Sequence, residues 1–208
     1  MFPLSSVFFP GEKVALHIFE ERYKQLIAEV RDVPMNFGIP VYIEGIMAYG
    51  TEMQLKEVIK TYDTGEMDII CTGLRSFKVK SFRQTMEGKL YAAGEVEFLP
   101  YFDDGVPTLR SKVLSLVMEL YNLMDVSLYD ITAGNFDVYR LIHKIGLTLA
   151  QEYKLLRMTY ESERLMFIKT HLINTIQVLK HVNKSKEMIG MNGYFKNFDP
   201  IDFKDFKM

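Results

Sequence analysis

Residues that carry catalytic chemistry in other proteins are few in this chain and lie far apart. The four histidines, His17, His143, His171 and His181, form no H-E-x-x-H pair and have no carboxylates at metal-site spacing. No G-x-S-x-G, Ser-x-x-Lys or local Cys-His signature of a nucleophile is present, and no G-x-x-x-x-G-K-[ST] phosphate loop. We therefore expect no catalytic residue, no metal site and no cofactor.

One run of basic and aromatic residues has the composition of a nucleic-acid-binding strand. It contains Arg75, Lys78, Lys80, Arg83 and Lys89, interleaved with Phe77 and Phe82. Two acidic residues, Glu95 and Glu97, follow on the next predicted strand, and the 25 basic and 27 acidic residues of the chain give a net charge of -2. The electrostatic footprint for a phosphate backbone is therefore small. RNA binding through Arg75, Lys78, Lys80 and Arg83 remains the alternative function, and nucleic acid is not the expected partner.

Cysteine content and hydropathy indicate the compartment. Cys71 is the only cysteine, so neither an internal disulfide nor a multi-thiolate zinc site can form, which fits a reducing environment. The first residues lack a basic leader before an apolar core and are interrupted by Pro10 and Gly11, unlike a signal peptide. Because no run of about 18 apolar residues occurs, we expect a cytoplasmic protein with no membrane partner.

The first half of the chain has the period of strands. Apolar residues alternate over 14–18 and again over 37–43, where Pro40 predicts an edge strand or a bulge. A helix is expected between these strands. Its apolar stripe consists of Phe19, Tyr23, Leu26, Ile27 and Val30.

Two hairpins follow in this half. Residues 76–84 and 89–98 flank a turn that ends at Gly88, in a register that places Phe77 opposite Val96 and Lys78 opposite Glu95. The other hairpin turns at 63–66. Many short strands and few helices predict a small barrel or sandwich.

The period becomes helical after a linker at 101–107. Thr108 is the candidate N-cap of the first helix, a second helix is expected from near Asn135, and the longest runs from about Thr159 to His181. Core spacing in these three helices is carried by Leu109, Val113, Leu116, Val117, Leu120, Met124, Val138, Leu141, Ile142, Ile145, Leu165, Ile168, Leu172, Ile176 and Leu179. The predicted organisation is a β half over 1–100, the linker, a helical bundle over 108–189 and an aromatic-rich tail without a helical stripe over 190–208.

Several motifs carry a family resemblance. The segment 2–23 contains Phe-Pro-Leu, Pro-Gly, and Ile-Phe-Glu followed by Arg-Tyr. FGIP, YGT, an Asp-x-Gly turn and DIICTGLRSFKV then occur in order at 37–40, 49–51, 63–65 and 68–79, and LLRM and ERL follow at 155–158 and 163–165. Over about residues 2–180 the chain resembles the N-terminal, substrate-recognising domain of the Lon protease family.

This resemblance implies a fold and a function. The implied fold class is α+β, with a PUA-like small β-barrel followed by a C-terminal helical bundle. In Lon proteases this domain recruits substrate proteins, whereas separate ATPase and Ser-Lys peptidase modules perform the chemistry. Since neither signature occurs here, we expect a stand-alone, non-catalytic module that binds unfolded or exposed apolar polypeptide. Its expected partners are polypeptide substrates or a partner protein, with a separate ATPase or protease as a further candidate.

The chain departs from the family pattern at one position. The family has arginine directly before the phenylalanine of its G-x-x-R-F motif, but this chain has Ser76 before Phe77, and Arg75 one place earlier. In a strand this shift turns the side chain to the opposite face, so the family's arginine contact is not expected.

The binding site is predicted at the junction of the β half and the helices, since clefts between domains favour ligands. Its candidate residues are Phe9, Phe19, Tyr23, Tyr101 and Phe102. Core packing is the competing role for each, and the stripe favours it for Phe19 and Tyr23. The neighbourhood of Tyr101 and Phe102 is acidic and contains glycine, which predicts exposure.

Overall fold

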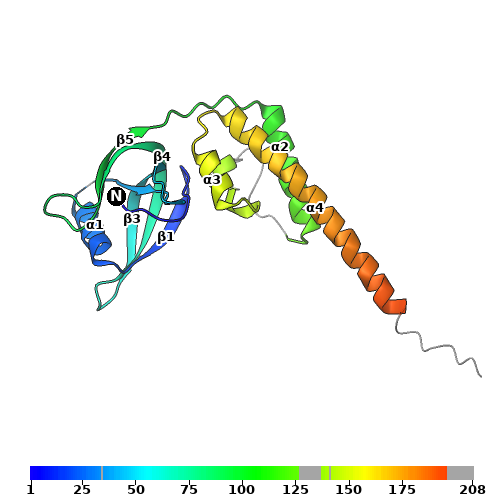
Figure 1. Cartoon of the computed structure of the whole chain (residues 1–208), viewed down its shortest axis with the longest axis horizontal. Helices are drawn as coiled ribbons and strands as arrows, with labels where there is room; N and C mark the ends of the chain where they lie inside the picture. The colour runs from blue at the N-terminus through cyan, green and yellow to red at the C-terminus, as the bar shows by residue number, and fades with distance from the viewer. Residues whose placement is uncertain (34, 127–136, 141, 196–208) are drawn as a thin grey trace, which may run out of the picture.

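A β-rich half is followed by a helical half in the computed structural model, which describes residues 1–33, 35–126, 137–140 and 142–195 (Figure 1). The β half contains β1 (Lys13–Ile18), α1 (Glu21–Asp32), β2 (Phe37–Pro40), β3 (Tyr49–Thr61), β4 (Met67–Arg83) and β5 (Ala93–Phe98). The helical half contains α2 (Pro107–Leu123), two 3-10 helices (Val138–Arg140 and Ile142–Lys144), α3 (Leu149–Leu156) and α4 (Glu161–Phe195).

The five strands form one antiparallel sheet around β4. The pairing order is β1-β4-β3-β2, and β5 also pairs with β4. Over its 17 residues β4 pairs with β3 along one edge, and with β1 and then β5 along the other. Met67, Ile69 and Cys71 of β4 are buried and alternate with partly exposed residues, so the predicted period of two places one face of the sheet on a core.

The expected PUA-like small β-barrel is not confirmed, because the sheet is not closed. β1 and β2 end the pairing order, and no strand among the described residues joins them. Backbone hydrogen bonds from Phe2 N to Gly38 O at 2.8 Å and from Leu4 N to Pro40 O at 3.1 Å cover the outer edge of β2 instead. The mixed α+β class, with an antiparallel sheet followed by helices, is confirmed, and so is the edge position of Pro40.

The register of the β4–β5 hairpin differs from the prediction by two residues. Phe77 lies opposite Phe98 and Lys78 opposite Glu97, so the predicted pairs with Val96 and Glu95 are wrong. The connection is longer than predicted, because Met86 N donates to the carbonyl of Tyr91 and β5 begins only at Ala93. This shifts the pairing by three residues next to the turn, and a bulge between Val79 and Ser81 reduces the shift to two at Phe77. A shift of two residues leaves each side chain on its expected face, and Phe77 is buried.

The predicted apolar stripe of α1 is correct except at its first member. Tyr23, Leu26, Ile27 and Val30 are buried. Phe19 lies before the helix begins, and 60% of its side chain surface is exposed. The helical spacing therefore does not apply to Phe19, and its predicted core position is wrong.

The start of α2 and the segment before α3 differ from the predictions. Val106 is the N-cap of α2 and Pro107 occupies its first turn, where the fixed φ of proline fits a helix, so Thr108 is not the cap. Asn135 and Leu141, in the second predicted helix, lie outside the described residues. Residues 138–140 and 142–144 form two 3-10 helices, whereas an α-helix was predicted, and Val138, Ile142 and Ile145 are buried as expected.

Helix α4 is longer than predicted and packs along α2 (Figure 1). The core positions from Leu165 to Ile176 are buried. The helix continues through residues 182–195, because good helix formers such as Lys184, Lys186 and Glu187 extend it without an apolar stripe. Residues 190–195 are thus helical, whereas the remainder of the predicted tail, 196–208, lies outside the described residues.

Two hydrophobic cores hold the fold together. One lies between the sheet and α1 and contains Tyr23, Ile27 and Cys71. The other fills the helical half, and it also takes Val7, Phe9 and Val41 from the β half. The segment before β1 is therefore buried in the helical core, which fixes the sheet against the helices.

Candidate functional site at the junction of sheet and helices

A gap along one edge of β4 marks the junction. The pairing of β4 with β1 ends at Thr72 and its pairing with β5 begins at Phe77, so residues 73–76 have no strand partner on this side among the described residues. Flanking segments close part of the gap, through Gly11 N to Gly73 O and Leu99 N to Ser76 O, both at 2.9 Å. On the β3 side a bulge leaves Leu74 without a paired residue, and bulges of this kind are frequent beside functional sites.

The approach of two backbones at this gap depends on Gly73. Its amide donates to Glu12 O at 2.9 Å, and a Cβ at this position would lie 2.2 Å from the carbonyl oxygen of Phe9. Only glycine fits here. The glycine thus lets the segment before β1 cross the sheet edge.

A cavity of about 330 Å³ lies over this gap. The helical half closes it from the other side, so the cavity is shared between the two halves. Its walls are formed by Pro10, Gly11, Leu74, Arg75, Ser76, Leu99, Pro100, Tyr101, Asp137, Tyr139, Leu156 and Met158. Apolar and aromatic walls with a few polar groups are typical of ligand pockets.

Tyr101 and Phe102 stand at this junction with exposed side chains. The exposed fractions are 55% for Tyr101 and 43% for Phe102. Their backbone is fixed, because Phe102 N donates to Thr159 O and Phe102 O accepts from Glu161 N, each at 2.9 Å. The Phe102 ring also stacks on Tyr160 with centroids 4.7 Å apart. The two aromatic residues are thus presented to solvent from a rigid connection.

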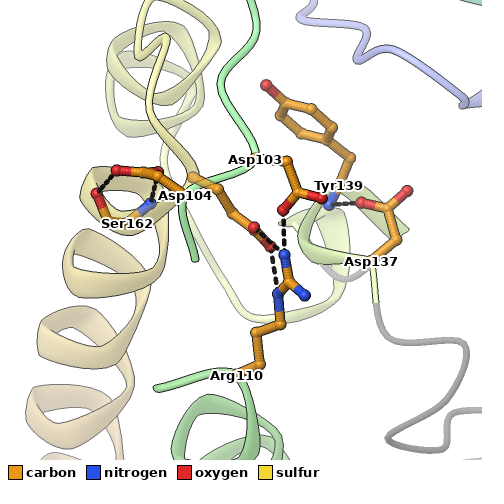
Figure 2. Close-up of polar contacts among 7 residues, drawn as sticks. Asp103, Asp104, Arg110, Asp137, Tyr139 and Ser162 are labelled. Carbon is orange, nitrogen blue, oxygen red and sulfur yellow. Dashed lines mark hydrogen bonds and ion pairs between the residues drawn. The ribbon is translucent and has the colours of Figure 1, made fainter. Parts of the chain in front are cut away.

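A polar cluster joins the connection that contains Asp103 and Asp104 to both long helices, α2 and α4 (Figure 2). The guanidinium of Arg110 in α2 donates to Asp103 and to both oxygens of Glu161 at the start of α4. Asp104 accepts from the backbone N of Ser162 at 2.9 Å and from its hydroxyl at 2.6 Å. These bonds hold the pKa of Asp104 below its usual range, and Glu161 raises the pKa of Arg110.

Arg164 lies behind the aromatic wall of the cavity. Its side chain is fully buried, with the guanidinium carbon 4.4 Å from the ring centre of Tyr101 and 5.2 Å from that of Tyr139. Nη1 donates to the carbonyl of Met158 at 2.8 Å. Burial raises the pKa of Tyr139 to about 12, so that this tyrosine is neutral over the physiological range.

The five predicted binding residues divide into three groups. Tyr101 lines the cavity and Phe102 adjoins it. Phe9 is fully buried in the helical core and stacks on Tyr139 with centroids 5.2 Å apart, so it supports the wall from behind. Tyr23 is buried in the other core against Phe2, and the exposed Phe19 stacks on His17. Neither Tyr23 nor Phe19 lines the junction cavity.

The basic run that predicted RNA binding is partly neutralised. Arg75 donates to Glu52 at 2.8 Å and covers the ring of Phe98. Lys80 pairs with Glu97. Lys78 and Arg83 are exposed. Two of the four predicted phosphate contacts are thus engaged by carboxylates.

The described ranges contain neither a metal-binding cluster nor a membrane-spanning helix. No cluster of three or more His, Cys, Asp or Glu side chains with metal-site geometry occurs in residues 1–33, 35–126, 137–140 and 142–195. In the same ranges no helix has both the length and the hydropathy needed to span a bilayer. Cys71 is fully buried, and burial raises the pKa of its thiol to about 12.

A second cavity, of about 560 Å³, lies in the β half between α1, β2 and β5. Its walls include Phe37, Phe77, Tyr91 and Phe98, and none of its residues comes from the helices α2 to α4. The junction cavity differs in having walls from both halves.

Periodicity did not identify four residues of the site: Asp137, Tyr139, Met158 and Arg164. They come from the segment before α3, the segment after it and the first turn of α4. A signal was available, because Met158 ends the LLRM motif and Arg164 is the centre of ERL. Both motifs resemble the family's sequence, but the resemblance assigned no function to Met158 or Arg164.

Comparisons with known proteins agree with this architecture. The crystal structure of a Lon N-terminal domain protein from Xanthomonas campestris superposes with a TM-score of 0.61 at 27% identity, over 79% of this chain and 92% of that one. The N-terminal domain of a Lon protease from the Mycobacterium avium complex matches in fold with a TM-score of 0.60 at 17% identity, over 82% and 96% of the two chains. No curated protein matches the sequence. Residues 1–184 match the family described as the ATP-dependent protease La (LON) substrate-binding domain. This chain therefore belongs to the Lon substrate-binding domain family.

Proposed function

We propose that this chain binds exposed apolar segments of unfolded or damaged proteins at the junction cavity, and that it catalyses no reaction itself. The observation that supports this most is the placement of Tyr101. Its ring forms part of the cavity wall while 55% of its surface stays exposed. The backbone of the next residue, Phe102, is held by two hydrogen bonds. A rigid aromatic residue offers a large contact area at a low entropic cost.

The expected affinity is modest. The cavity is small, and one apolar contact region supplies about -8 kcal/mol, which corresponds to a dissociation constant near 1 μM. Tyr101 and Phe102 are the proposed contact residues, with Phe9 and Tyr139 holding the wall in place. Phe9 and Tyr23 are buried, so they act on binding only through the fold.

The proposed partners follow from membership of the family. A module without chemistry of its own delivers its bound polypeptide to another protein, and we propose a separate ATPase or protease for this step. The proposed location is the cytoplasm, consistent with a single, buried cysteine.

RNA binding through Arg75, Lys78, Lys80 and Arg83 is the competing function. The ion pairs of Arg75 with Glu52 and of Lys80 with Glu97 weigh against it, because each engaged cation releases fewer counterions from a phosphate backbone.

Titration distinguishes the two functions. The purified chain is titrated by fluorescence anisotropy against a permanently unfolded, apolar model protein and against a structured RNA, at low and at moderate salt. We expect micromolar binding of the unfolded protein that changes little with salt. Salt-sensitive RNA binding without polypeptide binding would reverse the proposal.

A further inference from the structure

Arg164 is a buried cation without a full set of partners. It is the largest fully buried side chain among the described residues, and its Nη1 donates to Met158 O at 2.8 Å. Nε and Nη2 are buried and have no partner in the part of the chain that the structure describes. A buried charge of this kind costs several kcal/mol unless an opposite charge or a hydrogen-bond acceptor meets it.

The nearby carboxylates bond to other groups. Glu161 and Asp103 both accept from Arg110, and Asp104 accepts from Ser162. Figure 2 shows these residues together with Asp137, whose Oδ1 accepts from Tyr139 N at 2.9 Å. Within the described part of the chain, no carboxylate therefore bonds directly to Arg164.

The junction cavity gives a route to this guanidinium. Tyr101 and Tyr139 form part of the cavity wall, and the guanidinium carbon of Arg164 lies 4.4 Å from the ring centre of Tyr101 and 5.2 Å from that of Tyr139. Tyr139 is buried, whereas more than half of the Tyr101 surface is exposed. A ligand in the cavity would therefore reach Arg164 by displacing the more exposed Tyr101 side chain.

We propose that the junction cavity captures the C-terminal carboxylate of an apolar polypeptide, which pairs with Arg164 when the Tyr101 ring turns aside. This inference rests on the proposed function and names the part of the polypeptide that is recognised. The planar guanidinium presents its free Nε and Nη2 as a fork that matches both oxygens of a carboxylate. Capture of a chain end through its carboxylate is a recurring mode of peptide recognition.

The size and walls of the cavity favour a chain end over an internal segment. Its volume of about 330 Å³ is at the lower limit for ligand pockets. Leu74, Leu99 and Leu156 supply apolar surface for the last side chain. Arg75 also lines the cavity, but its Nε already donates to Glu52, so Arg164 is the stronger donor to an incoming carboxylate.

Asp137 opposes the binding of a carboxylate, and its substitution provides a second test. Its carboxylate belongs to the cavity wall and repels a second negative charge at short range. Asp137→Asn removes this repulsion, so we expect the variant to bind a free C-terminal carboxylate about threefold more tightly.

The test compares two forms of one peptide. An N-terminally labelled, eight-residue apolar peptide is prepared with a free C-terminal carboxylate and with a C-terminal amide, and both are titrated against the full chain. We expect the free acid to bind about tenfold more tightly, which corresponds to about 1.4 kcal/mol. Equal affinities overturn the carboxylate inference and leave the proposed function standing. Absence of binding by both peptides overturns the two together.

Two variants locate the carboxylate. Arg164→Met keeps an apolar side chain of similar length in the core, and it should abolish the difference between acid and amide while the amide still binds. Arg75→Gln should preserve the difference. A preference for the acid that survives Arg164→Met, or that disappears in Arg75→Gln, contradicts the assignment to Arg164.

A measurement on the unmodified chain covers the case in which Arg164→Met does not fold. The arginine Nε–H resonances are followed by proton–nitrogen NMR during both titrations. We expect one buried Nε–H signal to shift on addition of the free acid and to stay in place with the amide. Identical spectra for the two peptides contradict the proposal.

Discussion

The carboxylate of Glu161 and the guanidinium of Arg110 join the two long helices at the edge of the junction cavity. Arg110 Nε lies 3.0 Å from Glu161 Oε1, and Nη2 contacts the other carboxylate oxygen. Glu161 is only 6% exposed, and Arg110 donates to both of its carboxylate oxygens. The pair fixes the start of α4, and with it Arg164 one turn further on.

Loss of Arg110 should therefore destabilise the fold. Arg110→Met leaves the buried carboxylate of Glu161 without its main partner, which costs roughly 2 to 3 kcal/mol, below the usual 3 to 5 because Arg110 is partly exposed. The free energy of unfolding is measured by urea denaturation.

The matched control for Arg110→Met is Lys180→Met. Lys180 pairs with Glu119 across the same two helices, at 2.7 Å, but both side chains are exposed. We expect a loss of less than about 1 kcal/mol. Equal losses for the two variants would show that burial of Glu161 does not determine the strength of the Arg110 pair.

His143 should make stability depend on pH. It contacts Glu12 at 3.2 Å and Glu152 at 2.8 Å, and the hydrogen bond with Glu12 raises the pKa of His143 to about 9. Because the folded pKa lies above the unfolded value of about 6.5, the contribution is complete below pH 6.5 and is lost as the pH rises through about 9.

The check is a melting-temperature profile from pH 6 to pH 10 for the unmodified chain and for His143→Gln. The difference between the two profiles should be largest at pH 6 and should shrink toward pH 10. The exposed His181→Gln serves as the control. A difference that stays constant with pH rules out a charged His143 between Glu12 and Glu152.

Tyr23 and Phe19 should differ in stability effect. Tyr23 is 4% exposed and stacks on Phe2 with centroids 3.8 Å apart, so Tyr23→Ala should cost roughly 3 to 5 kcal/mol. Phe19→Ala removes a largely exposed ring and should cost less than about 1 kcal/mol. Urea denaturation of both variants tests this, and a large loss for Phe19→Ala would place that ring in a core.

The sequence predicted which side of each helix or strand is buried better than it predicted which segments pack against one another. Periodicity identified the buried side of α1 at Tyr23 and Leu26, because an amphipathic helix determines its own inward face. It did not identify the pairing of Phe77 with Phe98, since register depends on the length of the connecting loop. The open sheet was also missed, because closure depends on bulges and edge contacts that follow no local period.

The candidate site was predictable only in part for the same reason. Tyr101 and Phe102 could be predicted as exposed, because acidic residues and Gly105 follow them in a linker. Tyr139 and Arg164 meet Tyr101 only through the packing of separate segments. A single sequence does not specify such contacts, and the buried charge of Arg164 has no periodic signature.

Binding of unfolded polypeptide by the double variant Tyr101→Ala with Phe102→Ala tests the central claim most directly. The control is Phe19→Ala with Tyr42→Ala, which removes one phenylalanine and one tyrosine that are similarly exposed in the β half. Affinity is measured by anisotropy with an unfolded model protein, and the melting temperature is recorded for both double variants. We predict that affinity falls at least tenfold in the first variant and stays unchanged in the second, while each melting temperature moves by only a few degrees. Unchanged binding in Tyr101→Ala with Phe102→Ala, or unfolding of that variant, would contradict the proposed site.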